Sequence, residues 1–295
     1  MLAEIPKGEQ CTYRLEQRFR YTYATPVRAL RHRLLVVPRS MHGDQCRIDW
    51  GLTISGSPAQ VSVSSDEFDN HVIDVRAARV SGCIEFDVWA VVVRGGSEAD
   101  PNRSSVSETD GQYLEPTLLT QADGFLRGIA DQLSATSIDD LDFAEKACAW
   151  THRAMRYQFD VTSVHTTAAD ALAGGLGVCQ DFSHIMLALC RAGGIPARYV
   201  SGHLLGEGGS HAWVEALITD RIGSRTAVAF DPTHDRPAGN NYLTVAVGRD
   251  YTDVAPTSGW FEGNCPGLLS TTKRLVPVTL GELTINPPRR HAGSC

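Results

Sequence analysis

Apolar and polar residues alternate in short runs over the first third of the chain. The clearest runs cover residues 13–21, 61–64 and 84–93, and clusters of Gly, Pro, Asp and Asn interrupt them. A period of two with β-branched and aromatic residues is typical of half-buried antiparallel strands. We therefore predict an N-terminal antiparallel β-sandwich domain over residues 1–100.

The pattern changes after this region. Residues 94–109 are rich in Gly, Ser, Asp, Asn, Arg and Glu with almost nothing apolar, which is typical of a solvated connection between units. We expect the domain boundary there and a second domain over residues 110–295. Because helices and strands both follow, the fold class is predicted as α+β.

Helical periodicity begins in this second domain. Two helical segments follow the boundary, and the second covers about residues 139–157, with apolar residues spaced to bury one face. Thr167 and Asp170 resemble a capping box, and the Gly pair at 174–175 ends that short helix. The next helix begins near Cys179 and ends at the Gly pair 193–194. Strands are then expected over residues 197–204, 211–219, 225–230 and 243–247.

Three residues at the ends of these elements form a candidate catalytic triad. Cys179 begins a helix, His211 begins a strand and Asp231 ends one. A free thiol ionises near pH 8.5, and the unpaired amides and dipole at a helix N-terminus favour the reactive thiolate. The same amides could stabilise an oxyanion as the thiolate attacks a carbonyl group.

The strands that carry His211 and Asp231 are predicted to form a hairpin. If these two residues pair directly, the hairpin centres on residue 221, inside the turn-like segment 220–224. Opposed side chains share one face of a sheet, so the carboxylate could orient the imidazole. A register shift of two leaves them diagonal neighbours, whereas a shift of one separates them onto opposite faces.

The three side chains together suit nucleophilic catalysis. We expect His211 to take the thiol proton, Cys179 to form a thioester with an acyl group, and His211 to protonate the leaving amine. An amine or water then resolves the thioester. Asp231 could alternatively be a turn residue before Pro232, a role that is compatible with catalysis.

Several ordered motifs resemble the transglutaminase-like superfamily, in particular its bacterial branch with an N-terminal β domain. The resemblance covers nearly the whole chain, on the stretches at residues 21–27, 69–71, 177–204, 211–218, 230–234 and 248–259. It implies a papain-like core in which a Cys-bearing helix packs on an antiparallel sheet, with the triad Cys179, His211 and Asp231. The chain shows no Asp-x-Asp-x-Asp loop of the calcium-binding kind, so we expect no metal and no cofactor.

The expected function is a cysteine enzyme acting on a carboxamide or peptide bond of a protein or peptide substrate. Amine transfer, as in a transglutaminase, and hydrolysis, as in a peptidase or amidase, both follow from the same thioester. The alternative from a different class is a non-catalytic binding module that retains the triad. The sandwich domain could present substrate, mediate dimerisation or cover the core, and the oligomeric state stays open.

Other residues have simpler interpretations. Cys148 and Cys190 belong to apolar helix faces and are expected in the core. No functional signal is attached to Cys11, Cys46, Cys83, Cys265 and Cys295. Trp213 could line the cleft or fill the core, and Arg249 to Tyr251 could line the site or form an ion pair. His184, His203 and His234 are near the motifs, but their spacing matches no zinc signature.

Composition excludes some partners. The formal net charge of −7 argues against a phosphate-binding surface, so we expect no nucleic-acid partner. The first residues contain no apolar secretion signal, and no segment is apolar for long enough to span a bilayer. We therefore expect a cytoplasmic protein without a membrane partner. The eight scattered cysteines indicate neither a disulfide framework nor a metal knuckle.

Overall fold

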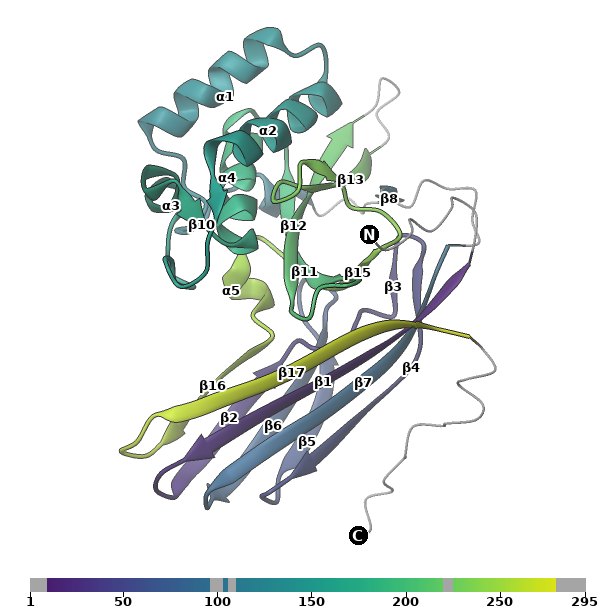
Figure 1. The fold of residues 1–295 in the computed structure, drawn as a ribbon, viewed down its shortest axis with the longest axis vertical. Coiled ribbons are helices and arrows are strands. Elements are labelled where there is room, and N and C mark those ends of the chain that lie inside the picture. Colours follow the sequence, from purple (N-terminus) through teal and green to yellow (C-terminus); the bar gives the residue numbers. More distant parts are fainter. Residues whose placement is uncertain (1–9, 96–102, 106–109, 220–224, 280–295) are drawn as a thin grey trace.

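The computed structural model describes residues 10–95, 103–105, 110–219 and 225–279. Figure 1 shows a β-sandwich beside a second unit, in which helices cover a sheet. This arrangement confirms the predicted α+β class with an N-terminal β domain. The expected turn at 220–224 and Cys295 lie outside the described residues.

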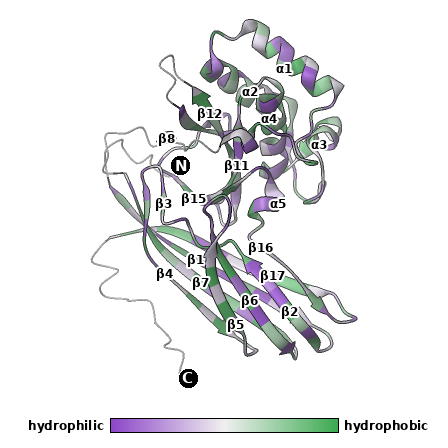
Figure 2. Ribbon diagram, turned by 180° about the vertical axis from the view of Figure 1, so that it is seen from behind, coloured by the Kyte–Doolittle hydropathy of each residue, from purple (hydrophilic) through white to green (hydrophobic). Residues whose placement is uncertain are grey.

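The sandwich consists of two antiparallel sheets. One has the order β17 (Gly267–Val278), β1 (Cys11–Tyr23), β7 (Cys83–Arg94), β4 (Gln45–Ser55) and β3 (Met41–His42). The other has the order β16 (Thr257–Glu262), β2 (Val27–Leu34), β6 (His71–Val80) and β5 (Gln60–Ser65). Hydropathy alternates along these strands (Figure 2), and the apolar faces, including Phe19, Ile73 and Phe86, form the core between the sheets.

The last two described strands belong to this sandwich. β17 pairs with β1 and β16 pairs with β2, so both lie beside the N-terminal strands in Figure 1. This differs from the expected assignment of residues 110–295 to the catalytic domain. Spatial neighbours of this kind are set by pairing between distant segments, which local periodicity does not report. The second unit is therefore inserted between strands of the first.

The second unit has a central antiparallel sheet. Its order is β14 (Arg236–Pro237), β13 (Arg225–Asp231), β12 (His211–Thr219), β11 (Ala197–Leu204) and β15 (Tyr242–Gly248), with β8 (Arg103–Ser105) pairing with β13. The helices are η1 (Asp110–Tyr113), α1 (Gly124–Thr136), α2 (Asp140–Ala154), α3 (Ala168–Gly174), α4 (Cys179–Ala192) and α5 (Tyr251–Val254). The expected helix over 139–157 ends earlier, because β9 (Arg156–Tyr157) pairs in parallel with β10 (Leu176–Gly177). Among the described residues, no helix combines the length and apolar character needed to cross a bilayer.

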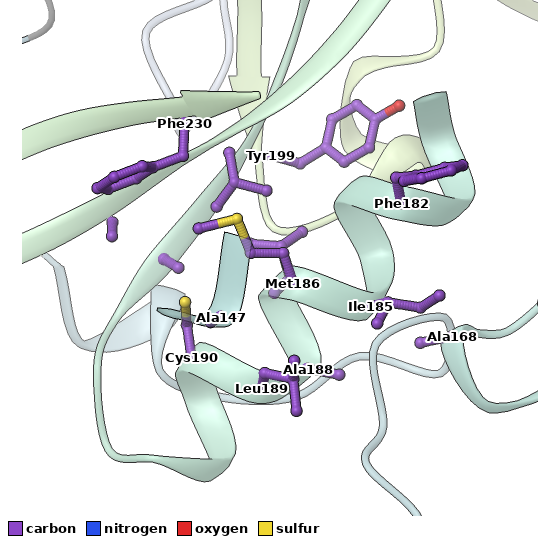
Figure 3. Close-up of a cluster of buried hydrophobic side chains, with 14 of the residues drawn as sticks. Ala147, Ala168, Phe182, Ile185, Met186, Ala188, Leu189, Cys190, Tyr199 and Phe230 are labelled. Atoms are coloured by element: carbon purple, nitrogen blue, oxygen red, sulfur yellow. The ribbon is translucent and has the colours of Figure 1, made fainter. Parts of the chain in front are cut away.

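Helix α4 is the centre of this unit. Figure 3 shows Ile185, Met186, Leu189 and Cys190 of α4 in one apolar cluster with Phe230 of the sheet. Every residue from 180 to 191 is buried. A helix that is enclosed on all sides cannot rotate or shift without breaking many contacts. Its first residue, Cys179, is therefore held in a fixed position.

Side chains of the sandwich bind the free edge of β15. Gln45 donates to the Thr244 carbonyl at 2.7 Å and accepts from the Thr244 amide at 2.9 Å. Asn70 forms the same pair of bonds with Val247, at 2.7 and 2.8 Å. Each side-chain amide thus takes the place of a neighbouring strand, and the backbone groups at this edge of the second unit's sheet are hydrogen-bonded by the other domain.

Candidate active site

Cys179 is the first residue of α4, and Asp181 holds the chain at this point. The Val178 amide donates to Asp181 Oδ2 at 2.7 Å, and the Thr162 hydroxyl donates to the same oxygen at 2.7 Å. Gly177 makes this possible, since a Cβ there would lie 2.6 Å from Asp181 Oδ2. The start of the helix that carries the thiol therefore depends on the particular residues Gly177, Thr162 and Asp181.

His211 and Asp231 come together, but in a different register from the one in which they pair directly. Val214 pairs with Phe230 and Ala216 with Val228, so Asp231 lies two residues from the position opposite His211. The two residues are diagonal neighbours on one face, and His211 Nε2 donates to Asp231 Oδ2 at 2.8 Å. The predicted register, with direct pairing centred on residue 221, is wrong by two residues. The two side chains still lie on one face and in contact, because a shift by an even number of residues keeps the face.

The ring of His211 also interacts with the thiol of Cys179. Burial disfavours the charged ring, but hydrogen bonds to Asp231 and Cys179 and their negative charges outweigh it and raise the pKa of His211 to about 10. His211 is only 3 % exposed and Asp231 is fully buried. At neutral pH the imidazolium is therefore the stable form, and it can pair with a thiolate.

Asp231 Oδ2 accepts from three side chains. Besides His211, the Nδ1 of His234 donates at 2.7 Å and the hydroxyl of Tyr242 at 2.7 Å. Arg236 in turn donates to the Tyr242 oxygen at 2.8 Å. Against burial, which favours the neutral acid, these bonds keep the pKa of Asp231 well below its usual range. The carboxylate therefore remains charged beside His211.

Glu207 lies at the open side of the site. Its Oε2 is 3.5 Å from His211 Nδ1 and its Oε1 is 3.5 Å from His234 Nε2. The side chains of Glu207 and His234 are 41 % and 36 % exposed, so this side is open to solvent. Tyr157 is also close: burial and then the negative charges of Cys179 and Glu207 raise the pKa of Tyr157 to about 12.

Sequence reasoning missed Glu207 and Tyr242 and considered His234 only as a metal ligand. Tyr242 begins the strand expected from residue 243, and nothing local distinguishes it from a core residue. Glu207 is in a Gly-rich connection between strands. Only His234 had a usable signal, because it follows Asp231 by three residues, within reach of a tight turn.

The structure also offers a possible set of metal ligands. Ligand atoms of His211, Asp231 and His234 lie within 4.8 Å of one another. In the described structure, however, Asp231 Oδ2 accepts a hydrogen bond from each ring, and a metal ion there would replace the bond that orients His211. These atoms fit a hydrogen-bonded triad better than a metal centre.

The remaining candidates have structural roles. Trp213 is 1 % exposed and packs in the sheet core. Cys190 is fully buried, and burial raises its pKa to about 12, as expected for a core thiol. Burial lowers the pKa of both His184 and His203 to about 4. Arg249 forms an ion pair with Asp253 at 2.9 Å.

Comparisons with known proteins agree with this architecture. The family model of the Transglutaminase-like superfamily matches residues 127–232. The family model of the Bacterial transglutaminase-like N-terminal region matches residues 13–93. The chain is 30% identical to the uncharacterized protein ML0607 of Mycobacterium leprae, over 82% of this chain and 90% of that protein. It is 26% identical to the uncharacterized protein Rv2569c of Mycobacterium tuberculosis, over 86% and 89% of the two chains.

A solved structure has the same fold. The crystal structure of a Cytophaga hutchinsonii protein, provisionally named a cysteine protease, superposes with a TM-score of 0.74 at 22% identity. The match covers 92% of each chain, so it includes both units. With matches to both family regions, the chain belongs to the transglutaminase-like superfamily, in the bacterial arrangement with an N-terminal β domain.

Proposed function

We propose that this protein is a cysteine enzyme that transfers an acyl group from a carboxamide or peptide bond of a protein or peptide substrate through a thioester at Cys179. The observation that supports it most is the environment of His211. One ring nitrogen is held by a buried carboxylate, and the thiol of Cys179 interacts with the same ring. A nucleophile, a base and an orienting group in this order define nucleophilic catalysis by a thiol.

The first half-reaction uses these three side chains. The Cys179 thiolate attacks the carbonyl carbon, and the oxyanion that forms is close to the unpaired amides of the first turn of α4. The C–N bond then breaks as the His211 imidazolium gives its proton to the departing amine. The products are a thioester at Cys179, free ammonia or amine, and a neutral His211. Asp231 keeps the ring in the orientation that these transfers need.

Selective alkylation tests the thiolate–imidazolium pair. We expect iodoacetamide to modify Cys179 rapidly at about pH 6, because an adjacent imidazolium makes a thiol more reactive. His211→Ala should abolish this rapid modification, and peptide mapping identifies the modified thiol. Cys83→Ala is the matched control, since it removes another partly exposed thiol, on strand β7 of the sandwich. Slow, ordinary alkylation in the unmodified protein would favour a non-catalytic binding module.

Product analysis distinguishes the two possible acyl acceptors. Incubation with the carboxamide substrate carbobenzoxy-glutaminyl-glycine and a labelled primary amine reports transfer as amine incorporation and hydrolysis as the free acid. The Cys179→Ala variant should give neither product. Ammonia release without amine incorporation would assign the protein to the hydrolases.

A further inference from the structure

The number of protons released differs between the two acceptors. A primary amine is an ammonium ion near neutral pH, with three N–H bonds, and the amide product retains one. Two protons must therefore leave the nitrogen, and His211 can take only one of them. Attack by water requires a single base, because the acid product ionises in solution. Efficient transfer to an ammonium ion thus needs a second proton acceptor close to the thioester.

The structure has further acceptors at this place. Glu207 Oε2 lies 3.5 Å from His211 Nδ1, and Glu207 Oε1 lies 3.5 Å from His234 Nε2. The thiol of Cys179 interacts with the same His211 ring. The other nitrogen of His234 donates to Asp231 at 2.7 Å. With Nδ1–H donating to Asp231, Nε2 is the nitrogen of His234 that can accept a hydrogen bond, and it faces the carboxylate of Glu207.

We propose that Glu207 and His234 form the site that holds a protonated primary amine as the acyl acceptor. This inference rests on the proposed thioester function. The carboxylate of Glu207, Nε2 of His234 and Nδ1 of His211 offer three acceptors for the three N–H bonds of one ammonium group. An amine bound there lies beside the thioester, since Glu207 and Cys179 both interact with the ring of His211.

The site becomes complete only after the first half-reaction. In the resting enzyme His211 is protonated and its Nδ1 side cannot accept from an ammonium ion. Once it has protonated the leaving group, Nδ1 presents a lone pair. The amine therefore binds productively to the acyl-enzyme and not to the free enzyme, which orders the two substrates.

The second half-reaction then balances. The ammonium nitrogen gives one proton to His211 and one to His234, and it forms a bond to the thioester carbon. The C–S bond breaks, and Cys179 leaves as a thiolate beside the His211 imidazolium. His234 passes its proton to water through its exposed edge, which returns the enzyme to its starting state.

Partitioning of a defined acyl-enzyme tests this proposal. p-Nitrophenyl acetate would acetylate Cys179 without any requirement for a natural substrate, and mass spectrometry would detect the thioester. The deacylation rate is then measured at about pH 8 with n-pentylamine, which is charged, and with hydroxylamine, which is uncharged. In Glu207→Gln we expect the preference for pentylamine over hydroxylamine to fall about tenfold, as for loss of a hydrogen bond to a charged group.

Two further variants complete the design. His234→Asn retains an N–H for Asp231 and removes Nε2, so its preference for pentylamine should also fall. Glu145→Gln, an exposed residue of α2, changes the net charge equally and should leave the preference as it is.

The outcomes separate the two proposals. A thioester that forms normally while Glu207→Gln slows both acceptors equally, or neither, overturns the acceptor site alone. Failure to form any thioester at Cys179 overturns the proposed function and this inference together. A selective loss with pentylamine in both variants establishes the site.

Discussion

At the scale of single residues, the site depends on one oxygen atom. Asp231 Oδ2 accepts from His211, His234 and Tyr242, and it is completely buried. Three donors around one buried carboxylate oxygen keep it ionised and fix its direction. The imidazole of His211 is therefore oriented by a carboxylate whose own position is fixed by its other hydrogen bonds.

Replacing this carboxylate should show its contribution. In Asp231→Asn we expect kcat/KM at neutral pH to fall by about a thousandfold or more, because the ring loses both its orientation and its charge partner. Steady-state kinetics on an acyl substrate would measure this. Asp235→Asn is the matched control, since Asp235 is exposed and its left-handed backbone tolerates Asn. Similar losses in both variants would contradict the role of Asp231.

The raised pKa of His211 gives a pH dependence with a definite sign. The folded value of about 10 exceeds the ordinary 6.5, so the native state retains a proton that the unfolded chain releases. The stabilisation is complete below about pH 6.5 and is lost as the pH rises through about 10. We expect activity to fall on the alkaline side near pH 10. NMR titration of the His211 ring would contradict this if the ring became neutral below about pH 7.

The chemistry of individual residues could be predicted only in part. Cys179, His211 and Asp231 are recognisable because each stands at the end of an element, where helix dipoles and strand termini place functional groups. Glu207 and Tyr242 reach the same site from a connection and from a core strand. Their contribution depends on how distant segments meet, and no local pattern contains that information.

At the scale of elements, the start of α4 is the most constrained point of the chain. Gly177, the Val178 amide and Asp181 fit together without space for another atom, and the rest of the helix is enclosed. Thr167 caps α3 and Gly175 ends it in a left-handed conformation, as predicted from the sequence. Local capping interactions therefore position α3, which precedes the nucleophile, and the start of α4, which carries it.

Adding one methyl group should disturb this start. We expect Gly177→Ala to lower the free energy of unfolding by about 2 kcal/mol, since its Cβ would overlap the Asp181 carboxylate. It should also slow alkylation of Cys179. Gly174→Ala is the control, because a Cβ there meets nothing within 4 Å. Denaturant unfolding of both variants gives the comparison, and equal stability would contradict the packing argument.

The hairpin illustrates what periodicity can and cannot determine. The bounds of β11 and β12 agree with the predicted residues 197–204 and 211–219. The register is displaced by two residues, since alternation constrains only its parity. Parity was sufficient to place His211 and Asp231 on one face.

At the scale of the whole molecule, the two units form one structure. Gln45 and Asn70 of the sandwich satisfy backbone groups of β15, and Arg94 donates to the carbonyl of Gly239 at 2.9 Å. The segment that carries Tyr242, and thus one donor to Asp231, is fixed from the other domain. The sandwich therefore has a structural role that its sequence did not predict: it holds the strand that carries Tyr242.

Removal of one interface amide should destabilise both units together. We expect Gln45→Ala to lower the free energy of unfolding by about 2 to 4 kcal/mol, because it leaves the buried amide and carbonyl of Thr244 without partners. Gln60→Ala, on an exposed strand of the same sandwich, should change it little. Differential scanning calorimetry would measure the unfolding of both variants and of the unmodified protein. Separate transitions for the two units in the unmodified protein would contradict this coupling.

The pairing of β1 with β17 has a consequence for the synthesis of the protein. Thr12 lies opposite Val278, so the larger sheet cannot be completed until nearly all of the described chain has left the ribosome. Contacts over such distances form slowly. During translation, Cys179 and the strands β12 and β13 therefore emerge before the sandwich can be completed.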